Sequence, residues 1–421
     1  GELYLAHSDG TASQKLLAMN SFLADPVWAS NGARLRFSSS DGFGPDIGQH
    51  MQWEVNADGS HLHRILEGWH TPPDECCGTW TPDGHYYIFQ SAGQIWALPR
   101  GNRFFSSKLK PIQLTFSPMS LHSPVSSRDG SKLFVVGKTF RGELARYDTK
   151  KSQFEPFLGG VSAEYVSFSR DGAWAAYISY PQGSLWKCRV DGSERVQLTF
   201  PPYKPVLPRW SPDGKAILFF EYPQGTGQPA QIYQLPAYGG TPVVLMPTDT
   251  HNQQDPSWSP DGGRIAFSGD AKDAAADMNA PAIHIYDATT TKVTAVPGSQ
   301  GLFSPRWSPD GHKLAALTTD SRTVKIFDFD TQQWSELGKG TLGWINWSKD
   351  GEWVYMLDFT GKGAVIRMKV KDGQVEKVVD LTDFVTTGQF GGSLSMGPDD
   401  APLLLRDTGT QDVYALDWTQ P

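Results

Sequence analysis

Three histidines stand in connecting segments of this chain where they could act as ligands. His70, His122 and His251 precede strand-like runs at comparable places in a repeated pattern. Imidazole nitrogens suit transition metals, and a water molecule could take an open coordination position. The same connections carry other polar, aromatic and sulfur groups. The full set of candidate ligand-binding residues is Trp69, His70, Cys76, Cys77, His122, Tyr203, His251 and Gln254.

The alternative interpretation is that these histidines cap strands or face solvent. No short ligand spacing of the kind found in metal-binding motifs surrounds any of them. We therefore favour the solvent-facing interpretation, and we expect no metal and no other cofactor. A metal site formed by His70, His122 and His251 is kept as the second hypothesis.

Cys76 and Cys77 are adjacent, and a reactive thiol there would need electropositive surroundings. Asp74 and Glu75 directly precede the pair, and nearby carboxylates would raise the pKa of a thiol. We therefore expect buried structural cysteines. With Cys188 as the third cysteine, the sequence shows no disulfide framework and does not fix the cellular compartment.

Composition argues against several classes of function. Asp and Glu number 45 against 37 Lys and Arg, a formal net charge of −8, so we expect no direct nucleic-acid binding. No run of 18 apolar residues occurs, and we expect no membrane insertion. The sequence contains no Gly-x-Ser-x-Gly elbow, Walker loop or dinucleotide fingerprint. Enzyme activity is therefore left open, with a non-catalytic role preferred.

A five-residue pattern recurs along the chain and organises it. Its clearest copies read Trp-Ser-Pro-Asp-Gly and lie at 210–214, 258–262 and 307–311. Degraded copies lie at 28–32, 80–84, 127–130, 168–172, 347–351 and 396–400. The nine copies follow one another at steps of 40 to 52 residues, a period typical of propeller blades.

The residue types of this pattern predict a tight turn. Proline presets φ at the first turn position, and the aspartate can accept hydrogen bonds from nearby backbone amides. Glycine supplies the left-handed conformation that a Cβ atom would penalise. We therefore interpret Asp213, Asp261 and Asp310 as turn residues and not as a catalytic series.

Each turn is followed by short strand-like runs, such as 217–220, 232–235 and 243–245, so that one repeat comprises four strands. We predict an all-β chain of 37 strands folded as a single closed β-propeller of four-stranded blades. Residues 1–421 would form one domain, with terminal strands at 1–20 and 393–418 closing the ring. We favour nine blades, because nine motifs are countable, and keep eight as the alternative.

Long, irregular connections fall mostly on one face of this predicted propeller. They include 41–50, 222–230 and 270–280, together with 69–77, 201–208 and 248–256, which hold all the candidate site residues except His122. Insertions confined to one face usually mark the binding face, because the scaffold tolerates them there. The motif tryptophans, in contrast, are expected to fill the packing between blades.

The Trp-Ser-Pro-Asp-Gly turns followed by Ile- and Leu-rich strands resemble the TolB-type propeller repeat over essentially the whole chain. Segments 141–148, 185–195 and 404–414 resemble one branch in particular. In that branch, acidobacterial regulators carry a winged-helix, CadC-like DNA-binding domain ahead of the propeller. The resemblance implies a sensor or interaction module. Because residues 1–5 begin inside a strand-like run, we expect the chain to be cut from a longer regulatory polypeptide.

Three functional hypotheses follow. The first is a non-catalytic, monomeric binding or sensor module that recognises a peptide, protein or small ligand on the loop face or in the central channel. The second is a metal-dependent enzyme using His70, His122 and His251. Oligogalacturonate lyases have a similar repeat fold and a His-rich metal site. The third is a structural scaffold. An extracytoplasmic, periplasmic location is preferred to a cytoplasmic one.

Overall fold

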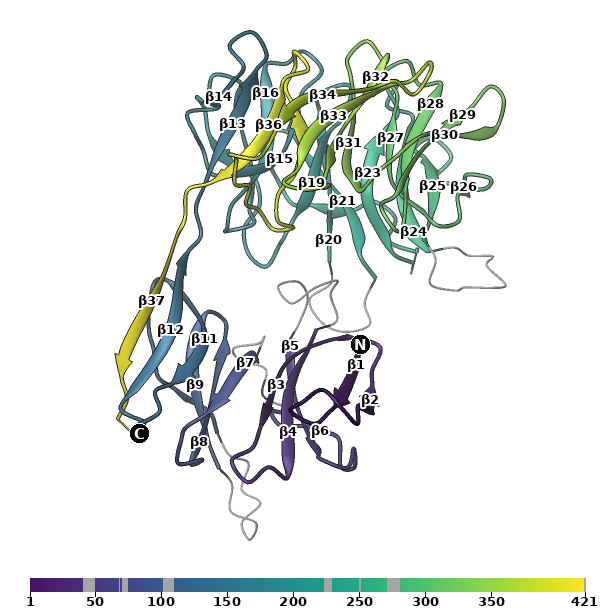
Figure 1. Cartoon of the computed structure of the whole chain (residues 1–421). Helices are drawn as coiled ribbons and strands as arrows, with labels where there is room; N and C mark the ends of the chain where they lie inside the picture. Colours follow the sequence, from purple (N-terminus) through teal and green to yellow (C-terminus); the bar gives the residue numbers. More distant parts are fainter. Residues whose placement is uncertain are drawn as a thin grey trace. The chain divides into compact units, whose positions relative to one another are not determined.

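The computed structural model describes residues 1–40, 50–67, 69, 75–100, 110–222, 229–249, 251–270 and 281–419, with Asp270 described by its backbone. Within these ranges the chain forms 37 strands and no helix (Figure 1). Accordingly, no helix long and apolar enough to cross a bilayer is found in the described part of the chain. The predicted all-β class, built from four-stranded antiparallel sheets, is confirmed.

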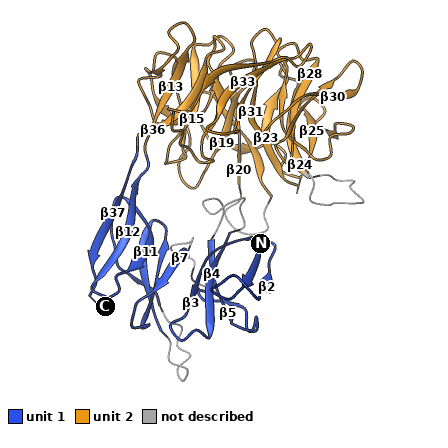
Figure 2. Cartoon of the chain, viewed as in Figure 1, with its two compact units in different colours: residues 1–140, 409–421 blue, residues 141–408 orange. Residues whose placement is uncertain are grey.

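The described residues fall into two compact units (Figure 2). Unit 1 comprises residues 1–140 and 409–421, and unit 2 comprises residues 141–408. The chain therefore enters unit 2 once and leaves it once. The sequence predicted one domain over residues 1–421.

Unit 2 contains six four-stranded sheets. Five of them are consecutive in sequence. The first two are β15 (Ala163–Phe168), β16 (Trp174–Ser179), β17 (Leu185–Arg189) and β18 (Val196–Gln197), then β19 (Val206–Trp210), β20 (Ala216–Glu221), β21 (Gln231–Pro236) and β22 (Val243–Val244). The third and fourth are β23 (Gln253–Trp258), β24 (Arg264–Asp270), β25 (Pro281–Asp287) and β26 (Val293–Ala295), then β27 (Leu302–Trp307), β28 (Lys313–Thr318), β29 (Thr323–Asp328) and β30 (Gln333–Lys339). The fifth is β31 (Leu342–Trp347), β32 (Trp353–Asp358), β33 (Ala364–Lys369) and β34 (Val375–Asp380).

The sixth sheet of unit 2 is assembled from two distant segments. It has the order β14-β13-β36-β35, with β13 (Gly142–Asp148) and β14 (Gln153–Pro156) from one end of the unit and β35 (Ser395–Met396) and β36 (Pro402–Asp407) from the other. The central ladder runs from Gly142 opposite Asp407 to Arg146 opposite Leu403. The start and the end of unit 2 are thereby hydrogen-bonded to each other.

These six sheets form a closed ring. The first strands β15, β19, β23, β27 and β31 each contact the next, β31 contacts β35, and β35 contacts β15. The motif turns show the same closure. A Cβ atom added at Gly351 would meet Pro309 of the preceding turn at 3.6 Å, and one added at Gly172, in the first turn of the unit, would meet Pro398 of the last turn at 3.3 Å. Unit 2 is therefore a six-bladed propeller with its first strands around the centre.

Unit 1 uses the same repeat in a different set of sheets. Its four-stranded sheets are β3 (Phe22–Trp28), β4 (Arg34–Ser40), β5 (His50–Asn56) and β6 (His63–Arg64), and β7 (Glu75–Trp80), β8 (Tyr86–Ser91), β9 (Gln94–Pro99) and β10 (Ile112–Gln113). A three-stranded sheet holds β11 (Ser120–Ser126), β12 (Lys132–Thr139) and β37 (Thr410–Asp417), and a two-stranded sheet holds β1 (Glu2–Leu5) and β2 (Gln14–Ala18).

The strand count matches the sequence prediction, but the terminal pairings differ from it. The sequence predicted that strands in 1–20 would complete the blade of 393–418. Instead β1 pairs with β2, while β37 pairs along the whole of β12, from Lys132 opposite Asp417 to Thr139 opposite Thr410. The third and ninth repeats thus exchange strands, and nine sheets, divided between the two units, each contain one motif turn.

The motif turns adopt the geometry that their residues predict. At 210–214, the Ser211 hydroxyl donates to Asp213 Oδ1 at 2.6 Å, and the same oxygen accepts the Lys215 backbone N–H at 3.0 Å. Gly214 has φ +72°, in the left-handed region. The Ser211 hydroxyl has the largest effect in lowering the pKa of Asp213, and the backbone N–H donors lower it further. The turn role of the motif aspartates is confirmed.

A β-bulge interrupts eight of the first strands three residues before the motif tryptophan. The residues at these bulges have φ between 48° and 60° and are Asp25, Cys77, Ser123, Tyr165, Leu207, Asp255, Ser304 and Trp344. Proline follows at five of them, where a missing N–H removes no ladder bond. The bulge changes which side chains reach the centre of the ring, and it therefore positions the site described next.

Candidate functional site

The residue just before each motif tryptophan lies beyond the bulge, on the opposite face of its strand from that tryptophan. In unit 2 these residues are Ser167, Arg209, Ser257, Arg306, Asn346 and, before Met396, Ser395. The first five of them line one cavity of about 260 Å³ at the first strands of the ring. The fold therefore gathers one equivalent position from successive blades around a shared space.

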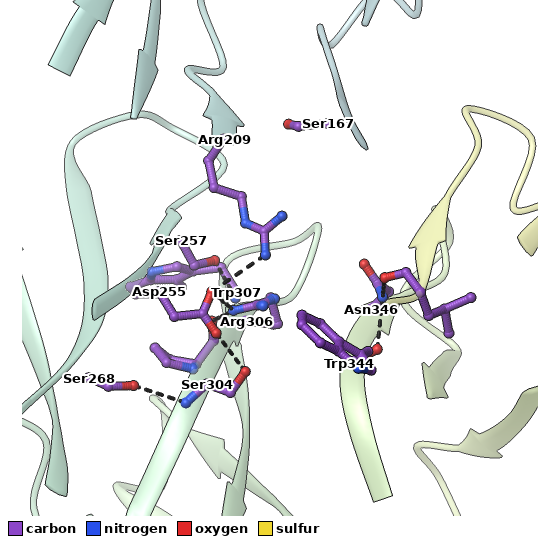
Figure 3. A network of polar contacts seen from close by, with 12 residues as sticks. Ser167, Arg209, Asp255, Ser257, Ser268, Ser304, Arg306, Trp307, Trp344 and Asn346 are labelled. Atoms are coloured by element: carbon purple, nitrogen blue, oxygen red, sulfur yellow. Dashed lines mark hydrogen bonds and ion pairs between the residues drawn. The ribbon is translucent and has the colours of Figure 1, made fainter. Parts of the chain in front are cut away.

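Two arginines and one aspartate form an ion-pair cluster in this ring (Figure 3). Asp255 Oδ1 lies 2.9 Å from a terminal nitrogen of Arg306 and 3.5 Å from a terminal nitrogen of Arg209. The Ser304 hydroxyl donates to Asp255 Oδ2 at 2.6 Å. Because Arg209, Asp255 and Arg306 come from β19, β23 and β27, the aspartate joins three consecutive blades.

Hydrogen bonds between blades fix the smaller side chains of this ring. Ser167 Oγ accepts the backbone N–H of Trp210 at 3.1 Å, and Ser257 Oγ accepts that of Trp307 at 3.2 Å. The Asn346 amide donates to the Leu394 carbonyl at 3.1 Å. Each of these side chains reaches the following blade, so the cavity wall is held by the same contacts that hold the ring together.

The cluster has more positive than negative charge. Two guanidinium groups face one carboxylate, and the side chains of Arg306, Asp255 and Arg209 are only 9%, 11% and 18% exposed. Burial, reinforced by the neighbouring charge of Arg306, lowers the pKa of Arg209 to about 9. Arg209 is therefore still charged at neutral pH, and two guanidinium groups beside one carboxylate give the cluster a net charge of +1.

The cluster also has unused hydrogen-bond donors. The Nε atoms of Arg209 and Arg306 are buried and have no hydrogen-bond partner among the described residues. A buried charged donor without a partner costs free energy, which a bound acceptor would recover. Because both arginines line the cavity, an acceptor group that enters it can pair with a guanidinium group.

A second polar group lies at the start of β15, before the bulge. Glu164 is 3% exposed, and its Oε2 accepts the backbone N–H of Gln389 at 2.9 Å. Burial raises the pKa of Glu164 to about 7. The neighbouring Tyr165 ring stacks on Trp344, with ring centroids 5.5 Å apart. The Glu164 carboxyl group is thus close to half-protonated at neutral pH.

A larger cavity of about 450 Å³ lies between two motif turns of unit 2. Its walls include Asp213 and Asp261, whose carboxylates are engaged by the serine hydroxyls and backbone amides of their own turns. Because these groups are already satisfied, we place the candidate site in the smaller, arginine-lined cavity.

Unit 1 holds the predicted candidates Trp69, Cys76, Cys77 and His122. Trp69 packs edge-on against Phe89 and Trp96, with centroids 5.7 and 5.2 Å apart, and so belongs to a hydrophobic cluster. Cys76 and Cys77 are joined in a disulfide bond, a pairing that the sequence analysis did not anticipate. His122 Nδ1 lies 3.1 Å from the Ser123 hydroxyl. His70 lies outside the described residues.

Unit 2 holds the other three predicted candidates. Tyr203 packs edge-on against Tyr233, and His251 Nδ1 lies 2.7 Å from Asp249 Oδ1. Gln254 directly precedes Asp255 on β23, opposite Ser268. The hypothetical metal site would need His122 of unit 1 together with His251 of unit 2. Among the described residues, no group of three His, Cys, Asp or Glu side chains is placed to hold a metal ion.

The sequence analysis did not single out Arg209 or Arg306. Both directly precede a motif tryptophan, and an alignment of the nine repeats at that position would have shown two arginines there. The search for histidines and for long loops directed attention to the connections between blades. The two arginines could have been found at the repeat position directly before the motif tryptophan, because the motif turn requires no particular side chain there.

Comparisons with known proteins agree with this fold. The chain is 25% identical over 258 residues to an uncharacterised protein of Agrobacterium fabrum, covering 59% of this chain and 85% of that protein. It is 27% identical over 195 residues to a TolB homologue of Chlorobium chlorochromatii, covering 44% of this chain and 40% of the homologue. No protein-family model matches the chain.

Among solved structures, a candidate TolB protein from Agrobacterium tumefaciens is similar, with a TM-score of 0.50 and 18% identity. The similarity covers 64% of this chain and 99% of that structure. Together with the sequence relatives, it supports the TolB-type propeller fold that the motif predicted.

Proposed function

We propose that this chain is a non-catalytic binding module that recognises a protein or peptide partner at the arginine-lined cavity of unit 2. The observation that carries the proposal is the buried cluster of Arg209, Asp255 and Arg306, with its net positive charge and unused Nε donors. Such a cluster is expensive to build unless a ligand completes it. Its place on three first strands makes the site rigid, as recognition requires.

We further propose that the module acts in a larger regulatory or sensor protein outside the cytoplasm. The Cys76–Cys77 disulfide supports this location, because disulfides persist in oxidising compartments. The TolB-type fold supports an interaction role. The connection residues Tyr203 and His251 of unit 2 stay in the proposal as separate candidate contacts.

A peptide-display selection tests the proposed site. Random peptides would be selected on the whole protein, and their affinities compared with those for Pro398→Trp, which places an indole at the cavity wall. Pro309→Trp is the matched control, because both prolines occupy the same turn position against the glycine of the next turn, and only Pro398 lines this cavity. We expect Pro398→Trp to weaken binding at least tenfold and Pro309→Trp to leave it unchanged. Equal binding to both variants would refute the site.

A further inference from the structure

We propose that the cavity of unit 2 binds a carboxylate group carried on a small apolar moiety, held between Arg209 and Arg306. This inference rests on the proposed function and deepens it, because it names the chemical group that the partner must present. A carboxylate could come from the C-terminus of a peptide or from a free aliphatic acid, and the two sources share the same recognition chemistry.

The charge of the cluster favours a monoanion. Two guanidinium groups and the Asp255 carboxylate leave one uncompensated positive charge. A carboxylate would neutralise it, whereas a phosphate ester with about −1.5 to −2 charges at neutral pH would leave the buried site negative. Because uncompensated charge is costly in a desolvated site, a carboxylate is the better match.

The geometry of the arginines favours a planar acceptor. Arg306 uses one terminal nitrogen for Asp255, at 2.9 Å, and for the Pro305 carbonyl, at 2.8 Å. Its Nε is free of partners in the described structure, as is Nε of Arg209. In Arg306, Nε and the second terminal nitrogen form the fork with which a guanidinium binds a carboxylate through two hydrogen bonds, whereas one terminal nitrogen of Arg209 already donates to Asp255.

Apolar side chains also contribute to the cavity wall and can accommodate an apolar carrier. Val166, Phe168, Trp307, Trp347 and Met396 contribute to it beside the polar ring. The volume of about 260 Å³ lies below the range of pockets that enclose drug-sized ligands. The cavity therefore has room for one small acid or one terminal residue, such as a C-terminal leucine, and not for a long buried segment.

The first experiment compares acids with neutral isosteres on the whole protein. Isothermal titration would use isovalerate against isovaleramide, the peptide Gly-Gly-Leu with a free C-terminus against its amide, and inorganic phosphate, all at matched ionic strength. We expect the acids to bind at least tenfold more tightly than the amides and than phosphate. Tighter binding of the free acid than of the peptide would indicate a metabolite as the source, and the reverse order a protein C-terminus.

The second experiment uses variants that act on the charge. Arg209→Gln and Arg306→Gln should each weaken binding of the acids about tenfold, and Arg367→Gln, on the outer part of a blade and paired with Glu376, should have no effect. Pro398→Glu would place a tethered carboxylate at the cavity wall and should abolish binding, while the isosteric Pro398→Gln should not. Arg170 and Lys349 occupy the same turn position in other repeats, so long side chains are tolerated there.

The outcomes separate this inference from the proposed function. If no acid binds, or if acids bind equally to the Arg209→Gln/Arg306→Gln variant, the carboxylate inference is wrong. Displayed peptides that bind at the cavity in amidated form would retain the proposed function and refute the inference. Free acids that bind while no displayed peptide does would retain the inference and refute the protein-binding role.

Discussion

The two units use the same repeat but place different side chains at one position. Directly before the motif tryptophan or its equivalent, unit 2 has Ser167, Arg209, Ser257, Arg306, Asn346 and Ser395, and unit 1 has Val27, Thr79 and Val125. The turn and the bulge occur in both units, so neither of these features requires a polar residue there. Scaffold and chemistry are therefore encoded separately within the repeat, and the chemistry is concentrated in unit 2.

The largest expected effect concerns how each unit completes its sheets. Removal of residues 409–421 deletes β37, which pairs with β12 over eight residues, and leaves all strands of unit 2 intact. We expect calorimetry of this truncated chain to show loss of the unit 1 transition and an unchanged unit 2 transition. If both transitions disappear together, the chain behaves as the single domain that the sequence predicted.

A smaller effect compares the motif tryptophans of the two units. Trp210 is 9% exposed and packs within a hydrophobic cluster drawn from neighbouring blades, whereas Trp28 is 47% exposed. We expect Trp210→Ala to lower the free energy of unfolding by ~3–5 kcal/mol and Trp28→Ala to lower it by less than ~1 kcal/mol. Denaturant unfolding measures both. Similar losses of free energy in the two variants would show that packing of the exposed tryptophan stabilises the protein as much as packing of the buried one.

The contrast between turn and site also explains what could be predicted from sequence. The Trp-Ser-Pro-Asp-Gly pattern encodes its turn through local hydrogen bonds and φ preferences, so nine turns and 37 strands were predictable. β37 joins the sheet of β11 and β12, whereas β35 and β36 join the sheet of β13 and β14. These pairings connect distant parts of the chain, and the strands of the different repeats have nearly the same sequence pattern. Local signals cannot specify which equivalent strand a terminal strand will join.

The site was harder to predict for a related reason. Arg209 and Arg306 are 97 residues apart in sequence and meet at Asp255 only because the ring places β19, β23 and β27 side by side. The histidines were singled out for their chemistry alone, and the structure divides His122 and His251 between units. The repeat position, more than the residue type, identifies which side chains converge.

Glu164 of unit 2 and Glu54 of unit 1 should make stability depend on pH in opposite directions. Burial raises the folded-state pKa of Glu164 to about 7, so between pH ~4.5 and 7 the unfolded chain has lost a proton that the folded chain keeps. Stability of unit 2 then falls as pH rises through this window, by up to ~3 kcal/mol for this group. In unit 1, Arg36 and Arg34 lower the pKa of Glu54 despite its burial, so its contribution is lost on acidification below pH ~4.5.

Glu164→Gln tests this contrast. The amide keeps an acceptor for the Gln389 N–H but cannot ionise, so the fall in unit 2 stability between pH ~4.5 and 7 should flatten. Glu54→Gln should leave that window unchanged and reduce stability at neutral pH, because two arginines lose their ion-pair partner. Unfolding curves across this pH range measure both. An unchanged slope in the Glu164 variant would contradict the assigned cause.

The smallest effect should come from the disulfide of unit 1. A disulfide stabilises mainly by closing a loop in the unfolded chain, and that effect grows with loop length. Cys76 and Cys77 are adjacent, so the bond closes almost no loop, and the buried Cys188 is not part of it. Reduction, or the Cys76→Ser/Cys77→Ser variant, should change the free energy of unfolding by less than ~1 kcal/mol and leave carboxylate binding in unit 2 unaltered. Calorimetry with and without reductant measures the first quantity, and titration with isovalerate measures the second. If reduction weakens binding of isovalerate, a change in unit 1 affects the site in unit 2. The binding site would then depend on both units and not on unit 2 alone.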